Sequence, residues 1–180
     1  VSTDEGRPNY GGTPSDDAVF AAIEAIKVRG LKVVFYPFVL MDVPAGNGLS
    51  DPYGGGEQAP FPWRGRITVS PAPGMEGSPD GTAAADADIS ALVGTAAASD
   101  FAGAGGVVAY GGPAEWTLRR MMLHYAHLCA QAGGVDAFLV GSELRGLTTV
   151  RGAGGTRTSA PAARPPRRIA RKACSSAAVM

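Results

Sequence analysis

The order of elements along the chain most constrains its fold, because an amphipathic helix followed by a glycine break and a short apolar strand occurs twice. Residues 16–29 have apolar side chains at helical spacing behind Ser15, a residue type that commonly caps helices. The segment 31–40 that follows is rich in β-branched and aromatic residues, although Pro37 predicts that regular pairing ends near Tyr36. A repeated helix and strand order predicts a parallel α/β fold.

The second repeat ends at a carboxylate. One apolar face predicts a helix over residues 113–132, and two glycines follow it. The run Ala137 to Val140 is then predicted to be a strand buried on both faces, as in a parallel sheet. Glu143 follows this strand, at the end where α/β barrels carry their chemistry.

Two interpretations of Glu143 are open. A carboxyl group beside apolar walls is disfavoured in its charged form, which suits a general acid. Alternatively, Glu143 caps the next turn or pairs with Arg145. Asp42 lies past the first predicted strand, at the same end of the sheet if the strands are parallel. Paired carboxylates are what acid–base glycoside chemistry requires, whereas the alternative for Asp42 is an Asx turn that stabilises its loop.

The long connection of residues 41–78 is rich in glycine and proline. A loop of this length is either functional or disordered, and its aromatic residues favour an ordered binding loop. Tyr53 and Trp63 could stack on a sugar ring, and Arg64 and Arg66 could bind anionic groups. Alternatively, the aromatic side chains fix the loop to the rest of the fold.

The remaining patterns are weaker. An alanine-rich helix is predicted over residues 79–97, and residues 103–110 resemble a small hairpin. We expect His124 and His127 to face solvent, because their spacing and the lack of a third ligand do not indicate a metal site. Neither a P-loop nor a dinucleotide fingerprint is present, so no cofactor is expected.

Charge divides the chain at Val150. Residues 1–150 hold all 16 acidic residues and nine of the 16 basic ones, a net charge of −7, and seven basic residues follow. The acidic part argues against nucleic acid as a partner, and the composition of residues 151–180 predicts a basic disordered tail. Cys129 and Cys174 indicate no disulfide framework. With no initiating Met, signal peptide or long apolar segment, we expect part of a larger protein without membrane insertion.

Several strings resemble one family in order along residues 1–150. They are Tyr10-Gly-Gly-Thr-Pro-Ser-Asp16, the segment from Phe35 to Asn47, Asp51-Pro-Tyr-Gly54, Pro62-Trp-Arg-Gly-Arg-Ile67, Gly112-Pro-Ala-Glu-Trp116, His124-Tyr-Ala-His127 and Gly141-Ser-Glu-Leu-Arg-Gly-Leu147. This part of the chain resembles the glycoside-hydrolase TIM-barrel-like domain of the tail-tip proteins of gene transfer agents and related phages.

The resemblance implies a partial (β/α)8 barrel over residues 1–150, within a tail baseplate particle assembled in the cytoplasm. It implies a protein that engages or hydrolyses cell-envelope polysaccharide or peptidoglycan and contacts other tail proteins. Glu143 would occupy the position of a barrel-strand carboxylate, although Ser142 stands where many barrel glycosidases have Asn. The alternative is a non-catalytic structural or glycan-binding module.

The candidate residues follow from these two lines of argument. Glu143 and Asp42 are the candidate catalytic residues, and the candidate substrate-binding residues are Tyr36, Tyr53, Trp63, Arg64 and Arg145. Since the chain is too short for a complete barrel, which needs about 250 residues, we expect it to be inactive alone. We also hypothesise that a frameshift produced the tail after Val150.

Overall fold

The computed structural model describes residues 3–4, 7–8 and 13–155. The elements in chain order are β1 (Thr3–Asp4), β2 (Arg7–Pro8), α1 (Asp16–Val28), β3 (Val34–Phe35), the 3-10 helix η1 (Arg64–Arg66), α2 (Ala83–Val93), the 3-10 helix η2 (Ala98–Asp100), β4 (Phe101–Ala102), β5 (Ala109–Tyr110), α3 (Leu118–Gln131), β6 (Ala137–Phe138) and α4 (Arg145–Thr149). Strands β1 and β2 pair antiparallel, as do β4 and β5, whereas β3 and β6 pair in parallel. The described part therefore mixes helices and strands, and contains no closed sheet.

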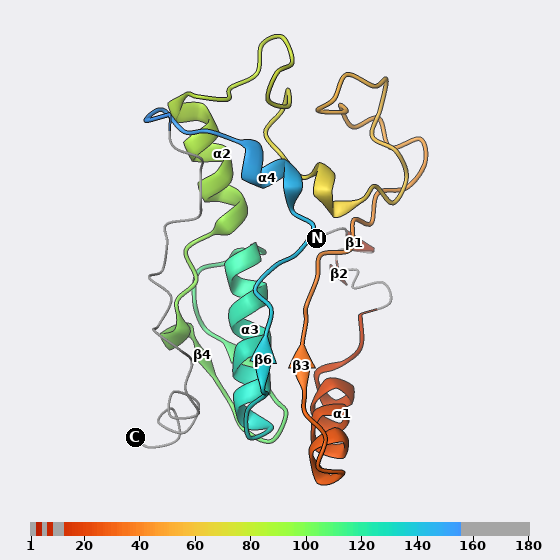
Figure 1. Ribbon diagram of the computed structural model, residues 1–180, viewed down its shortest axis with the longest axis vertical. Coiled ribbons are helices and arrows are strands. Elements are labelled where there is room, and N and C mark those ends of the chain that lie inside the picture. The colour runs from red at the N-terminus through yellow and green to blue at the C-terminus, as the bar shows by residue number, and fades with distance from the viewer. Residues whose placement is uncertain (1–2, 5–6, 9–12, 156–180) are drawn as a thin grey trace.

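The parallel pair brings together the two strand segments indicated by the sequence. Val34 lies opposite Ala137 and Phe35 opposite Phe138. Asp136 sets the start of the pairing, because its Oδ2 accepts a 2.9 Å hydrogen bond from the backbone N–H of Val33. Both strands run toward the end of the molecule where α4 lies (Figure 1). The predicted parallel arrangement is thus confirmed, although each strand has only two residues.

The prediction that these strands are buried on both faces is wrong. The side of Phe35 is covered, since its ring lies 5.5 Å from that of Tyr125 on α3. Val34 is 62% exposed and Val140 is 69% exposed. No element in the described part of the chain covers their face, so these apolar side chains meet solvent.

The first core cluster lies between α1, α3 and the parallel strands. Its buried residues are Val19, Ile23, Val33, Leu128, Cys129 and Ala132. The side chain of Lys27 on α1 ties the two helices further, because its Nζ donates to the carbonyls of Ala132 and Gly134 at 2.8 and 2.9 Å. Cys129 is a buried cysteine in this core, and Cys174 lies outside the described residues.

The second core cluster lies at the other end of the molecule, where Figure 1 places α2 and α4. It contains Val69, Ala85, Ile89 and Val150. Past Val150, the Arg151 side chain binds Asp80, and the backbone N–H of Ala153 donates to Asp86. These contacts extend beyond the predicted domain end at residue 150. The predicted disordered tail otherwise falls on residues 156–180, outside the described part.

The local boundaries differ from the predicted ones because particular side chains cap the helices. Thr82 accepts a hydrogen bond from the N–H of Ala84, so α2 begins at Ala83 rather than near residue 79. Thr117 caps α3 in the same way, so that helix begins five residues later than predicted. The expected hairpin is present, but its strands are β4 and β5, and residues 107–108 belong to the loop between them.

The expectation that both histidines face solvent is also wrong. His124 Nε2 lies 2.8 Å from Asp16 Oδ1 at the start of α1. The His127 ring stacks on Phe101 with centroids 5.2 Å apart. Both side chains are half-buried because α1 and β4 cover the helix face that the sequence pattern left polar.

Candidate functional site

Glu143 lies in the short segment that joins β6 to α4. Its backbone φ is +57°, in the left-handed region that a side chain with a Cβ rarely adopts. Its side chain is 49% exposed. Such strain persists where the surroundings hold it and is common at functional sites. The residue chosen from the sequence is therefore held in an unusual conformation at the molecular surface.

Two side chains from the long loop meet the carboxylate of Glu143. Arg64 Nη2 lies 2.6 Å from Glu143 Oε2, and the indole N–H of Trp63 donates to the same oxygen at 3.0 Å. Hydrogen bonds to a charged partner are shorter and stronger than neutral ones. The structure thus brings together three of the residues selected from the sequence, although they are about 80 positions apart.

The 3-10 helix η1 orients Trp63 and Arg64 through a glycine. A Cβ atom placed on Gly65 would lie 2.4–2.5 Å from three ring carbons of Trp63, so no side chain fits there. The indole ring therefore lies directly over the backbone of Gly65, while the whole residue remains 49% exposed. The packing of the indole ring explains why glycine stands in the Trp-Arg-Gly-Arg string, and the sequence alone does not reveal this contact.

Aromatic side chains from the segment after β3 support Arg64. Its guanidinium lies 4.6 Å from the ring centroid of Phe38, which in turn lies 5.6 Å from the ring of Tyr36. The Tyr36 hydroxyl and the Nε of Arg64 are buried with no hydrogen-bond partner among the described residues. Buried polar atoms are usually satisfied, so these two groups are exceptions among the described residues. Tyr36, a predicted substrate-binding residue, lies beside this cluster.

Helix α4 sets the distance between Glu143 and η1. A Cβ on Gly146 would lie 2.3 Å from the carbonyl oxygen of Ile67 and 2.8 Å from that of Gly65. Thr68 Oγ1 donates to the Gly146 carbonyl at 3.3 Å across the same contact. Only glycine permits this close approach. This role could not be predicted from the sequence, because a lone glycine in a short helix carries no packing signal.

Tyr53 and Arg66 form a separate arrangement with Asp51. Arg66 Nη2 binds both carboxylate oxygens of Asp51, at 2.7 and 2.9 Å, and its guanidinium lies 4.4 Å from the Tyr53 ring centroid. A hydrogen bond from the Tyr53 backbone N–H, together with Arg66, lowers the pKa of Asp51. Arg64 and Arg66 were predicted to bind anionic groups, and in the structure both bind carboxylates of the chain itself.

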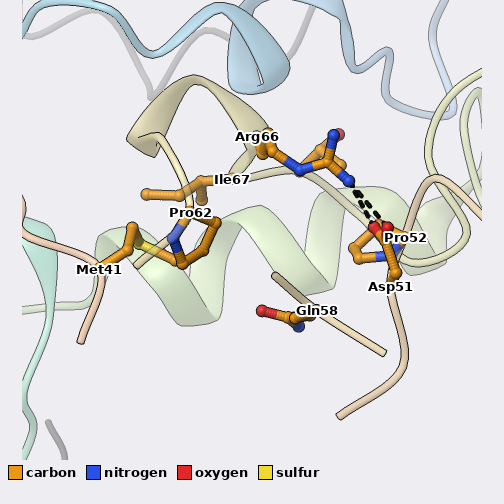
Figure 2. A pocket seen from close by; sticks show the side chains of 8 residues that line it. Met41, Asp51, Pro52, Gln58, Pro62, Arg66 and Ile67 are labelled. Carbon is orange, nitrogen blue, oxygen red and sulfur yellow. Dashed lines mark hydrogen bonds and ion pairs between the residues drawn. The ribbon is translucent and has the colours of Figure 1, made fainter. Parts of the chain in front are cut away.

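A cavity of about 160 Å³ lies beside the Asp51–Arg66 pair. Figure 2 shows Met41, Pro62 and Ile67 on one side of it and Arg66 and Asp51 on the other. Pro62 directly precedes Trp63, and Arg66 ends η1. The cavity is therefore continuous along the chain with the residues that contact Glu143.

The two remaining candidate residues are Arg145 and Asp42. Arg145 is exposed at the start of α4, and the ion pair of Glu143 is with Arg64 rather than Arg145. Asp42 is exposed in the irregular segment after β3. That Asp42 and Glu143 act as a catalytic pair stays a prediction.

Two further kinds of functional feature, metal sites and membrane-spanning helices, are absent from the described residues. Within residues 3–4, 7–8 and 13–155, no group of three or more His, Cys, Asp or Glu side chains is arranged to hold a metal ion. Within the same ranges, no helix has the length and apolar character that a membrane span requires.

Comparison with known families bears on the segment that carries Glu143. Residues 116–175 match the family model of the GTA TIM-barrel-like domain. The match covers a third of the chain and includes α3, β6 and α4. It confirms the resemblance to the gene transfer agent domain and relates the chain to gene transfer agent proteins. Neither the curated proteins nor the solved structures that were searched gave a match.

Proposed function

We propose that this chain is part of a gene transfer agent or phage-type tail protein, and that its partial (β/α)8 barrel engages cell-envelope glycans. Polysaccharide or peptidoglycan would be the ligand, and other baseplate proteins would be its neighbours in the tail particle. The support for a GTA-related protein comes from the family match over residues 116–175. The glycan function is our inference from the site.

One observation carries the proposal: a half-exposed Trp63 shares the Glu143 carboxylate with Arg64. Sugar rings combine an apolar C–H face with hydroxyl groups on the rim. An exposed indole offers a stacking surface for such a face, and a carboxylate and a guanidinium next to it offer an acceptor and donors for hydroxyls. In the structure these three groups lie side by side.

Binding without cleavage is the function that this geometry favours. Glu143 accepts hydrogen bonds from two donors at one oxygen, which is how a charged carboxylate is held. A general acid instead needs a proton on that group when it reaches the glycosidic oxygen. The donors that orient Glu143 therefore suit recognition better than proton donation.

Hydrolysis is the second candidate, and the backbone of Glu143 favours it. A left-handed φ of +57° at the end of a parallel strand is a strained conformation in the place where barrels carry catalytic groups. In that case Glu143 would be the acid/base and Asp42 its partner, within a domain that contains the remaining barrel strands.

Sedimentation with purified peptidoglycan sacculi tests the binding function on the full chain. Trp63→Ala should weaken binding roughly tenfold, because an aromatic anchor is lost. Trp116→Ala is the matched control, since Trp116 is similarly exposed at 53% but lies outside the site. Equal losses in both variants, or no binding by the unmodified chain, would contradict the proposal.

Release of dye-labelled fragments from the same sacculi distinguishes the two candidates. A glycan-binding module releases no fragments with either Glu143 or Glu143→Gln. A hydrolase releases them, and Glu143→Gln stops release while the protein still binds, because the amide cannot transfer the proton. Glu24→Gln, on the exposed face of α1, controls for loss of charge alone.

A further inference from the structure

The cavity beside η1 has room for a substituent of a sugar ring. Its volume is about 160 Å³. An acetamido group, with its nitrogen, carbonyl and methyl, fits in this space.

The walls of the cavity differ in chemistry from one side to the other. Met41, Pro62 and Ile67 form an apolar side, which Figure 2 shows opposite the Asp51–Arg66 pair. A methyl group placed against the apolar side would leave water without losing a hydrogen bond. The apolar side alone would accept any small alkyl group, so the polar side decides the ligand.

The polar side supplies one acceptor and several donors. Arg66 uses Nη2 for Asp51, and a guanidinium has further N–H groups for a carbonyl oxygen. Gln58 donates through Nε2 to the Ser50 carbonyl at 3.2 Å, which fixes the orientation of its amide. Its Oε1 is then the end that accepts an N–H. Figure 2 shows the Gln58 side chain between the two sides of the cavity.

The position of the cavity connects it to the proposed glycan site. Pro62 of its apolar side directly precedes Trp63, and Arg66 of its polar side is two residues from Arg64. A sugar ring on the exposed Trp63 would thus have the cavity within the reach of a ring substituent. An unsubstituted hexose would leave the cavity unused.

We infer that this cavity is a subsite for the acetamido group of an N-acetylated hexosamine whose ring stacks on Trp63. The inference rests on the proposed glycan function and narrows its substrate class. The methyl packs on Met41, Pro62 and Ile67, the carbonyl oxygen accepts from Arg66, and the amide N–H donates to Gln58 Oε1.

Two tetrasaccharides with the same β-1,4 backbone provide the test. Tetra-N-acetylchitotetraose carries an acetamido group where cellotetraose carries a hydroxyl, and both are uncharged. Calorimetric titration of the full chain should show about tenfold tighter binding of the N-acetylated oligomer, because one methyl is buried and hydrogen bonds with Arg66 and Gln58 are gained. The measured quantity is the ratio of the two dissociation constants, which cancels effects common to both ligands.

Substitutions within the cavity locate the preference. Met41→Phe fills the space and should bring the ratio close to one. Gln58→Leu removes the acceptor but keeps the approximate volume, and should lower the ratio part of the way. Met75→Phe is the matched control, because Met75 is a partly exposed methionine of the same loop that does not line the cavity. Its ratio should stay near ten.

Each outcome bears on a different claim. Equal binding of the two tetrasaccharides overturns the subsite and leaves the glycan function standing. A preference that survives both Met41→Phe and Gln58→Leu shows that another part of the chain reads the acetamido group, and overturns the assignment to this cavity. Failure to bind either tetrasaccharide overturns the inference, and the sacculus assay then decides separately on the proposed function.

Discussion

At Glu143, the free energy that the side-chain contacts contribute is similar in size to the free energy that the backbone strain costs. A left-handed conformation costs a residue with a Cβ about 1–2 kcal/mol. An ion pair at a half-exposed carboxylate contributes about 0–1 kcal/mol, and a hydrogen bond such as that from Trp63 about 1 kcal/mol. These two contacts roughly offset the strain, so Trp63 and Arg64 help to hold Glu143 in this conformation.

A second carboxylate, Glu115, gives a prediction about pH. Its oxygens accept hydrogen bonds from the backbone N–H of Ala96, the hydroxyl of Thr117 and both the hydroxyl and N–H of Thr95, which lower its pKa to about 2. Because the folded pKa lies below the ordinary value of 4.5, this group stabilises the fold above pH 4.5. The contribution is lost as pH falls toward about 2.

Urea unfolding between pH 6 and pH 2.5 checks this prediction. Glu115→Gln should lower the free energy of unfolding at pH 6 and should show a smaller further loss on acidification than the unmodified chain. Glu24→Gln, exposed on α1, should keep the full pH dependence. An unchanged pH dependence in Glu115→Gln would show that other carboxylates cause the acid sensitivity.

At the scale of elements, the sequence predicts helices better than strands. The apolar faces of α1 and α3 are local periodic patterns, and both helices form close to where they are expected. The predicted strand over residues 31–40 shortens to Val34–Phe35, because strand length depends on a partner and β6 pairs only two residues with it. The residue pattern within one strand does not determine how many residues of another strand will pair with it.

The candidate site shows the same division. Trp63 and Arg64 could be chosen by residue type within the long loop, and Glu143 by its position after a predicted strand. Their meeting depends on two close approaches that have no sequence signature, that of the indole to Gly65 and that of Gly146 to the backbone of η1. The members of the site were predictable, whereas their geometry depends on packing between distant segments.

The contact between α4 and η1 can be tested at Gly146. Gly146→Ala places a methyl group against two backbone carbonyls that cannot rotate away, so α4 must shift. We expect a loss of about 1–3 kcal/mol in the free energy of unfolding and weaker binding to sacculi, because Glu143 moves from Trp63. Gly56→Ala has open space around it and should change stability by less than about 0.5 kcal/mol. Wild-type stability together with wild-type binding in Gly146→Ala would refute this role.

At the scale of the whole molecule, the two core clusters hold different groups of elements together. The first holds α1 and α3 on the parallel strands, and the second holds α2 and α4 near the residues that contact Glu143. Glu115 joins the two parts, since it binds Thr95 after α2 and Thr117 at the start of α3. Residues 13–155 thus place the candidate site at one end, on a base formed by α3 and the strands (Figure 1).

The first cluster should therefore control the stability of the whole described part. Leu128 is fully buried at 0% exposure between α1 and α3, so Leu128→Ala should lower the free energy of unfolding by about 2–5 kcal/mol. Leu40→Ala is the matched control, because Leu40 is 61% exposed and should cost no more than about 0.5 kcal/mol. Urea unfolding followed by Trp63 fluorescence in a Trp116→Phe background reports from the site end. The unfolding transition reported by Trp63 should move to a lower urea concentration in Leu128→Ala, because Glu115 couples the two parts. If this transition stays in place while the helical signal shifts, the two ends unfold independently.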